Sequence, residues 1–134
     1  MSYEEKIKEL KINLPEAKAP VGNYVATKIS GKMLFISGQI SIDENGQLIK
    51  GKVGKELDTE AGYNAAKRCA LSIIAQVKKA CDNDLSKVRS CVKLTGFVNS
   101  TDEFTEQPKI INGASDLIAA VFGDAGMHTR AAVS

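Results

Sequence analysis

The residues of this sequence with the clearest chemical potential are His128 and Arg130, two positions apart near the C-terminal end. His128 is the single histidine of the chain, and the short apolar segment 128–134 around both residues is typical of the start of a β-strand. The N–H donors of a guanidinium group form a fork that matches the two oxygens of a carboxylate. The segment therefore indicates either a carboxylate-binding site for a small molecule or an ordinary ion pair of a surface arginine.

Composition and charge narrow the function classes. The chain has 134 residues, of which 43% are hydrophobic and 25% charged, as expected for one globular domain with its own core. The net charge of +2 and the scattered lysines and arginines argue against a nucleic-acid partner. No segment approaches the ~20 apolar residues of a membrane span, and the acidic N-terminus differs from a signal peptide. We expect a single cytoplasmic domain over residues 1–134, without a membrane partner.

The cysteines and the standard motifs provide no metal or cofactor site. Cys69, Cys81 and Cys91 form no Cys-x-x-Cys pair, and one histidine does not complete a zinc ligand set. Free, buried thiols in a reducing compartment are expected instead. The sequence also lacks a GxGxxG motif, a P-loop, a GxSxG elbow and an HExxH motif, so we predict neither a cofactor nor a bound metal.

Hydrophobic periodicity predicts two long helices that would position the site. One is expected to begin at the N-cap candidates Asp58 or Thr59 and to end near Ala80. The second is expected over residues 109–122, because apolar residues recur there at spacings of three and four. Gly123 follows it and is typical of a helix end.

The strands are expected in three places. Residues 24–29 and 33–37 form two apolar runs around a Ser-Gly-Lys turn and predict a hairpin. Residues 88–98 alternate between apolar and polar side chains and predict a long strand, and residues 128–134 predict a final strand. Together with the helices, these elements predict an α+β domain with a mixed sheet and both long helices on one face.

The two ends of the chain carry one expectation each. Ser2 and Glu5 have the spacing of a capping box, which predicts a short helix over residues 3–11. At the other end, the final strand stops at Ser134 without a turn, and we expect it to be truncated there from a longer chain.

Four parts of the sequence, in this order and at these separations, resemble one family. They are Pro20-Val21-Gly22-Asn23-Tyr24, Phe35-Ile36-Ser37-Gly38-Gln39-Ile40, Val92-Lys93-Leu94-Thr95-Gly96-Phe97-Val98, and Asn112-Gly113-Ala114-Ser115 with the closing His128-Thr129-Arg130-Ala131-Ala132-Val133. The chain is similar to the Rid family (YjgF-like, also labelled L-PSP endoribonuclease), whose best-described members are enamine/imine deaminases. The resemblance covers almost the whole chain and points to a divergent branch. It implies a chorismate-mutase-like fold and a homotrimer with ligand pockets between subunits.

The resemblance also implies roles for individual residues. Arg130 matches the arginine that clamps a substrate carboxylate, and Tyr24 matches the tyrosine that lines the same pocket. Ser37 and Gly38 match the strand whose backbone borders that pocket. Asn112 matches a further substrate-binding position, although the segment before its helix is longer here.

The chain departs from the deaminase pattern around the arginine. Ala131 and Ala132 stand where the deaminases typically have Ser-Cys, and the pocket glutamate of the family lies on a strand beyond Ser134. On a regular strand, His128 would project to the same face as Arg130. It would then either donate a proton in the pocket or crowd it.

These residues are compatible with three functions. The first is hydrolytic deamination of small carboxylate-bearing enamines or imines, of the 2-aminoacrylate or 2-iminobutanoate type, with the carboxylate held by Arg130. The second is a non-catalytic trimer that binds or senses a small molecule. The third is an endoribonuclease-type activity, against which stand the low aromatic content of 5% and the absence of a paired general acid and base in the sequence.

Overall fold

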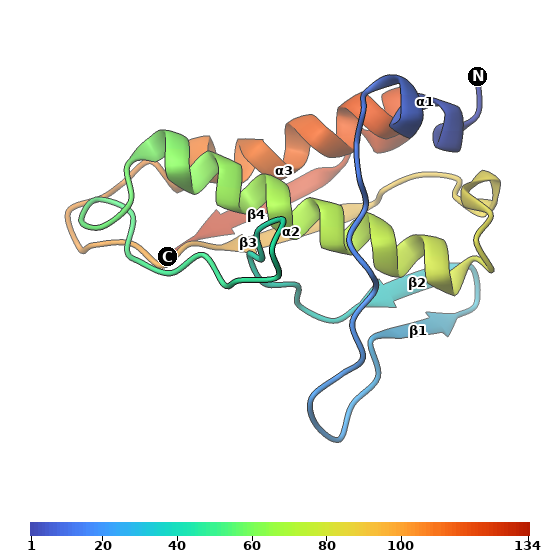
Figure 1. Ribbon diagram of the computed structural model, residues 1–134, viewed down its shortest axis with the longest axis horizontal. Coiled ribbons are helices and arrows are strands. Elements are labelled where there is room, and N and C mark those ends of the chain that lie inside the picture. Colours follow the sequence, from blue (N-terminus) through green and yellow to red (C-terminus); the bar gives the residue numbers. More distant parts are fainter.

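The computed structural model describes residues 1–134 and confirms the α+β class (Figure 1). Its elements in chain order are α1 (Tyr3–Glu9), β1 (Thr27–Ser30), β2 (Met33–Ile36), α2 (Thr59–Ala80), η1 (Leu85–Lys87), β3 (Lys93–Phe97), α3 (Gln107–Phe122), η2 (Gly123–Gly126) and β4 (Thr129–Val133), where η denotes a 3-10 helix. None of the helices is long and apolar enough to cross a membrane.

The starts of the first two helices follow their predicted caps. The carboxylate of Asp58 accepts the N–H of Ala61 at 2.8 Å, so α2 begins and ends where the sequence predicts. The capping box of α1 is formed in both directions: Glu5 N–H donates to Ser2 Oγ at 3.0 Å, and Ser2 N–H donates to Glu5 Oε2 at 3.2 Å. This helix ends at Glu9, before the predicted residue 11.

Helix α3 begins earlier than predicted and ends as predicted. It starts at Gln107 rather than residue 109, because Pro108 occupies its first turn, where a missing N–H group breaks no helical hydrogen bond. At its other end, Gly123 adopts a positive φ of 59° and closes the helix.

The strands form two separate two-stranded sheets, which corrects the prediction of one mixed sheet. β1 and β2 pair antiparallel, whereas β3 and β4 pair parallel with Leu94 opposite Arg130. A period-2 pattern determines which face of a strand is buried but leaves open which strand edges pair. β3 is also shorter than the predicted strand 88–98. To extend the parallel ladder, residues 88–92 would need a partner strand before β4, but the chain there forms the 3-10 helix η2.

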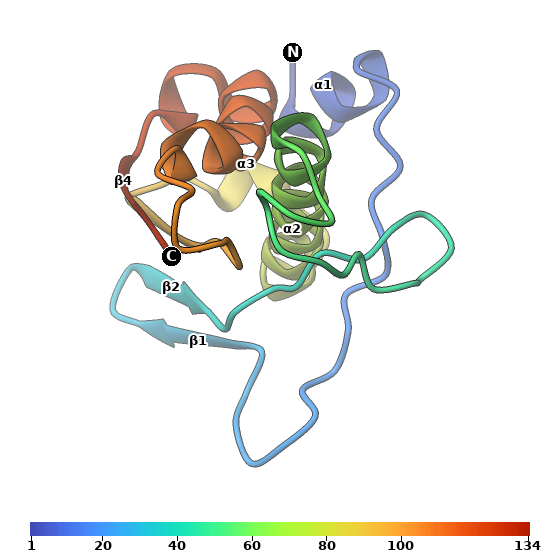
Figure 2. The same cartoon turned by 90° about the vertical axis from the view of Figure 1, so that its left-hand side faces the viewer.

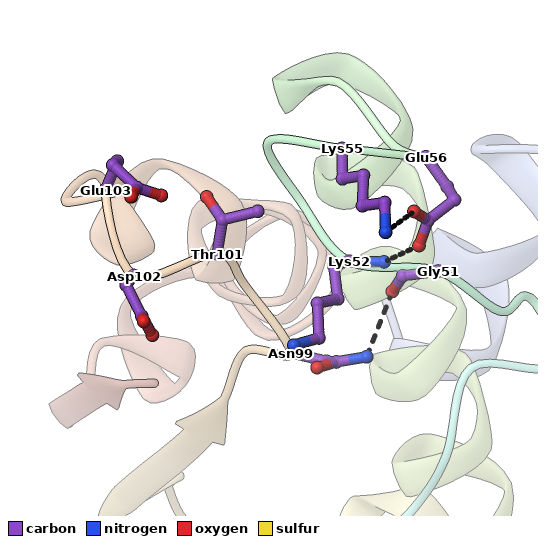
Figure 3. Close-up of a pocket in the computed structure, with 8 residues that line it drawn as sticks. All are labelled: Gly51, Lys52, Lys55, Glu56, Asn99, Thr101, Asp102 and Glu103. Atoms are coloured by element: carbon purple, nitrogen blue, oxygen red, sulfur yellow. Dashed lines mark hydrogen bonds and ion pairs between the residues drawn. The ribbon is translucent and has the colours of Figure 1, made fainter.

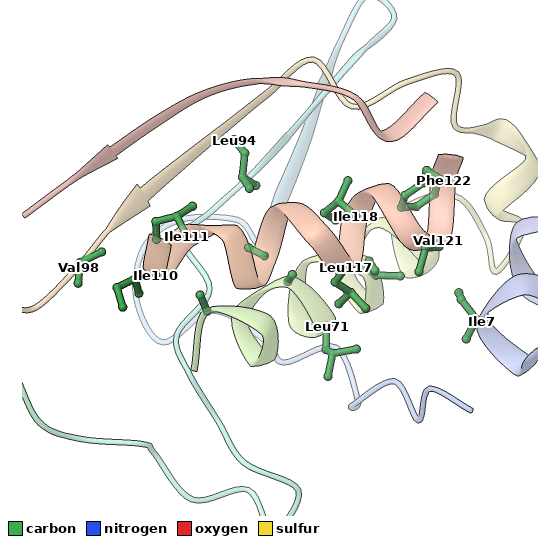
Figure 4. Close-up of a cluster of buried hydrophobic side chains, with 14 of the residues drawn as sticks. Ile7, Leu71, Leu94, Val98, Ile110, Ile111, Leu117, Ile118, Val121 and Phe122 are labelled. Carbon is green, nitrogen blue, oxygen red and sulfur yellow. The ribbon is translucent and has the colours of Figure 1, made fainter. Parts of the chain in front are cut away.

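The two long helices lie side by side within the angle made by the two sheets (Figures 1 and 2). α3 packs against β4, and α2 contacts the β1–β2 hairpin. Figure 4 shows the core between them, with Ile111 and Ile118 of α3 facing Leu94 and with Leu117 facing Leu71 of α2. The core therefore fixes the position of α3 relative to β4, from which the predicted arginine projects.

The spacing of apolar residues predicts that α2 buries a stripe of Ala66, Cys69, Ile73, Val77 and Ala80, and the buried stripe in the structure is rotated from it by about one residue. Ala70 and Ile74 are fully buried, whereas Cys69 and Ile73 are only half-buried. The small residues of this stripe bring α2 close to α3, because Ala66 and Ala70 leave room for the neighbouring helix. Spacing alone could not separate these two adjacent stripes.

The three cysteines are free and half-buried. Burial raises the pKa of the Cys69 thiol to about 11, so at pH 8 only about one Cys69 side chain in a thousand is a thiolate. We therefore expect iodoacetamide at pH 8 to modify Cys69 far more slowly than a free thiol, with a rate that continues to rise as the pH approaches 11. Mass spectrometry of the modified peptides measures this rate. Equal rates in the folded and the urea-unfolded protein would contradict the expectation.

Candidate functional site

Four side chains form one hydrogen-bonded group, here called the Arg130 cluster: Asn112 and Ser115 of α3, His128 just before β4, and Arg130 on β4. Arg130 Nη1 donates to Asn112 Oδ1 at 2.7 Å and to Ser115 Oγ at 3.3 Å. Ser115 Oγ also lies 2.9 Å from His128 Nε2. His128 and Arg130, two residues apart, thus reach the same hydroxyl group.

The Asn-Gly-Ala-Ser segment builds one side of this cluster because of its position on α3. Asn112 and Ser115 are three residues apart, which places them on one face of the helix, toward β4. Gly113 and Ala114, between them, are buried. A Cβ atom on Gly113 would overlap the main-chain carbonyl oxygen of Tyr63 in α2. The segment therefore seats α3 on α2 and presents two polar side chains to Arg130.

Arg130 is half-buried and has no acidic partner in the chain. Both of its hydrogen-bond partners are neutral, and both engage Nη1, so Nη2 and Nε have no protein acceptor. Arg68, in contrast, has an acidic partner: its Nη1 lies 3.7 Å from Glu44 Oε1, and its Nε donates to the Ile42 carbonyl oxygen. A half-buried guanidinium with free N–H groups and no counter-charge is suited to bind an anion such as a carboxylate.

His128 is oriented by contacts at both ring nitrogens. Nδ1 lies 2.6 Å from the carbonyl oxygen of Gly126, and Nε2 lies 2.9 Å from Ser115 Oγ. A carbonyl oxygen only accepts hydrogen bonds, so Nδ1 carries the proton in the neutral ring. The lone pair of Nε2 then faces the hydroxyl of Ser115, and the chain Gly126–His128–Ser115 has a defined direction.

The other three predicted site residues lie apart from this cluster, around the hairpin. Tyr24 precedes β1 and is 52% exposed, and its hydroxyl oxygen accepts the N–H of Val21 at 3.5 Å. Ser37 follows β2 and donates to the Val25 carbonyl oxygen at 2.6 Å, while Gly38 faces open space. No hydrogen bond within the chain joins these residues to Arg130. The structure thus brings together Asn112, His128 and Arg130, but not Tyr24, Ser37 and Gly38.

Ser115 is the member of the cluster that sequence reasoning missed. It lies in a segment that the sequence singles out, but without a role of its own. The usable signal was its spacing: on a helix over residues 109–122, a residue three positions after Asn112 shares its face.

A polar hollow of about 530 Å³ lies elsewhere, beside the loop that leads to α2 (Figure 3). Its lining has no hydrophobic residue and consists of Gly51, Lys52, Lys55, Glu56, Asn99, Thr101, Asp102 and Glu103. Lys55 Nζ lies 3.9 Å from Glu56 Oε2, and Glu56 Oε1 accepts the main-chain N–H of Lys52 at 3.0 Å. Small-molecule sites are mostly apolar with a few convergent polar groups, so this hollow is a weaker candidate than the Arg130 cluster.

Comparisons with known proteins agree with this fold. Residues 4–134 match the family described as "YjgF/chorismate mutase-like, putative endoribonuclease". Protein TCP17 of Trypanosoma cruzi is 44% identical over 128 residues, which are 95% of this chain and 79% of TCP17. Protein Atu1372 of Agrobacterium tumefaciens, a solved structure of unknown function, is 47% identical with a TM-score of 0.88, over 98% of this chain and 81% of that chain. A "putative endoribonuclease" structure from Shewanella oneidensis is 35% identical with a TM-score of 0.93, over 99% of this chain and 87% of that chain.

Proposed function

The chain belongs to the YjgF/chorismate mutase-like, putative endoribonuclease family, and from this premise we propose that it is a hydrolytic deaminase of small enamines and imines that carry a carboxylate. The observation that carries the proposal is the half-buried guanidinium of Arg130, which has only neutral partners and free N–H groups. A substrate carboxylate would supply the missing counter-charge.

The chemistry of the substrate class fits this arrangement. Nη2 and Nε of Arg130 would donate to the two carboxylate oxygens, and each such charge-assisted hydrogen bond contributes about 1.5–3 kcal/mol. The clamp fixes the neighbouring imine carbon, so that water attacks it from one direction. Addition of water and loss of ammonia then yield a 2-keto acid. The residues of the cluster require no cofactor for these two steps.

The experiment that tests the proposal generates the unstable substrate in place. A dehydratase that acts on serine or threonine releases 2-aminoacrylate or 2-iminobutanoate, and keto-acid formation is followed with and without this protein. We expect a faster release of keto acid when the protein is present. Equal rates at all protein concentrations would remove the deaminase function. Binding of 2-oxobutanoate without any acceleration would favour the non-catalytic binder instead.

We also propose that the chain forms a homotrimer with the site in a cleft between subunits. Phe97 and Val133, opposite each other on β3 and β4, are 78% and 44% exposed, and Phe35 on the hairpin is 58% exposed. Exposed apolar residues on sheet faces favour contact with another protein surface. A neighbouring copy could bring its Tyr24 and Ser37 to Arg130, to which they have no link within one chain.

The trimer can be tested by its dissociation. Phe97→Asp should place a charge in an apolar interface and shift the protein to monomers in sedimentation-velocity experiments. Lys79→Asp is the matched control, because Lys79 is exposed on the helical side of the molecule and its replacement should leave the trimer intact. A monomeric parent protein, or a trimer that tolerates Phe97→Asp, would contradict this assembly.

An endoribonuclease activity is the second candidate, because the family and the Shewanella oneidensis relative are described by that name. The net charge of +2 and the aromatic content of 5% give the chain few groups for phosphates and bases. RNA cleavage that persists through purification and disappears in His128→Ala would support it. We place either activity in the cytoplasm, in accord with the three free cysteines.

A further inference from the structure

We propose that Ser115 and His128 form a proton relay. The Ser115 hydroxyl exchanges protons with the reacting water and with the substrate nitrogen, and His128 accepts the proton from Ser115 and later returns it. The inference rests on the deaminase function proposed above and adds the groups that move its protons. Its basis is the directed hydrogen-bond chain from the Gly126 carbonyl through His128 to Ser115, which ends at Nη1 of Arg130.

The hydrogen bonds at Ser115 leave one position of its oxygen open. A hydroxyl has one proton and two lone pairs. The proton points to His128 Nε2 at 2.9 Å, and one lone pair accepts the Nη1–H of Arg130 at 3.3 Å. No further hydrogen bond of the chain reaches Oγ, so its second lone pair is free for a water molecule or a substrate nitrogen.

The first half of the reaction uses the relay as a base. The oxygen of a water molecule adds to the carbon of the protonated imine, and the π electron pair of the C=N bond moves to nitrogen. One proton of the water passes to Ser115 Oγ, while the proton of Ser115 passes to His128 Nε2. The products of this half are a neutral carbinolamine and an imidazolium whose Nδ1–H is still held by the Gly126 carbonyl.

The second half returns the proton. The imidazolium gives the Nε2 proton back through Ser115 to the amino nitrogen of the carbinolamine. The C–N bond then breaks, ammonia leaves with the bonding electron pair, and the hydroxyl proton is released to the ammonia. The overall change is one iminium and one water to one 2-keto acid and one ammonium ion, so atoms and charge balance and no oxidant or reductant is needed.

The position of Arg130 links the relay to substrate binding. Its guanidinium contacts the same hydroxyl as His128, so a carboxylate held by Arg130 would lie beside Ser115 and His128.

The kinetic test separates proton transfer from binding. In the dehydratase-coupled assay, Ser115→Ala and His128→Ala should each lower kcat about 100-fold and change KM by less than about threefold, in line with the usual contribution of general acid–base catalysis. Added imidazole should restore part of the activity of His128→Ala but none of the activity of Ser115→Ala. Thr129→Val is the matched control, because it removes a neighbouring hydroxyl that points away to the Val92 carbonyl oxygen.

A spectroscopic test is independent of turnover. His128 is the single histidine, so long-range ¹⁵N–¹H correlations contain one imidazole system only. The neutral ring should carry its proton on Nδ1, and Ser115→Ala should shift the Nε2 resonance. A proton on Nε2 in the neutral ring would overturn the relay, because that nitrogen could not then accept from Ser115.

The outcomes distinguish the relay from the function on which it rests. Absence of acceleration by the parent protein overturns both proposals. Acceleration that requires Arg130 but persists in His128→Ala overturns the relay alone. A His128→Ala variant that is slow, folded and unresponsive to imidazole also overturns the relay, because it assigns His128 a structural role.

Discussion

Replacing Arg130 by alanine should lower kcat/KM for 2-iminobutanoate about a hundredfold to ten-thousandfold. The variant loses two charge-assisted hydrogen bonds of about 1.5–3 kcal/mol each, and every 1.4 kcal/mol corresponds to a factor of ten. The loss should appear in both kcat and KM, because the clamp binds the substrate and also orients the imine carbon toward water. The dehydratase-coupled assay described above measures the effect directly.

Two further variants show whether this effect belongs to the guanidinium fork. Arg130→Lys keeps the charge but loses the bidentate geometry, so it should recover only a small part of the activity. Arg89→Ala removes an exposed arginine and should leave kcat/KM unchanged. Thermal melting of Arg130→Ala is needed as well, since the side chain also joins Asn112 and Ser115 across α3 and β4. Equal activity of Arg130→Ala and the parent protein would remove Arg130 from the site.

The helices could be predicted from the sequence because their signals are local. The Ser2–Glu5 capping box and the Asp58 N-cap depend on spacings of three residues, and both are present in the structure. The two long helices also carry apolar residues over several turns, so a shift of one residue in the buried stripe of α2 did not change their bounds. Local chemistry thus determined which elements form.

The sheet arrangement and the complete cluster could not be predicted in the same way, because they depend on contacts between distant segments. Nothing in the alternation of residues 88–98 shows that β3 pairs with β4 in parallel and that the hairpin forms its own sheet. Ser115 has a role only because α3 places it within hydrogen-bonding distance of both His128 and Arg130. The family resemblance could name Arg130 and Asn112 from their positions, but the hydroxyl between them required the geometry.

Gly113→Ala should destabilise the protein, although alanine is the better helix former. A Cβ atom at this position would overlap the Tyr63 carbonyl oxygen and lie 3.2 Å from the main-chain nitrogen of Lys67. Main-chain atoms of α2 cannot rotate away as a flexible side chain can, so α3 must move away from α2. We expect a loss of about 2–4 kcal/mol in the free energy of unfolding, which exceeds the gain of about 1 kcal/mol from helix propensity.

Ala120→Gly on the exposed side of the same helix provides the matched control for this prediction. It should cost only about 1 kcal/mol, since propensity is the main effect there. If helix propensity decided the outcome, Gly113→Ala would raise the melting temperature and Ala120→Gly would lower it. Close packing of α3 on α2 predicts instead that both variants lower the melting temperature. The larger drop, on the order of 10 °C, is then expected in Gly113→Ala. A rise for Gly113→Ala would show that α2 and α3 can separate freely. A drop would mean that Gly113 allows α3 to pack closely enough on α2 for Asn112 and Ser115 to reach Arg130.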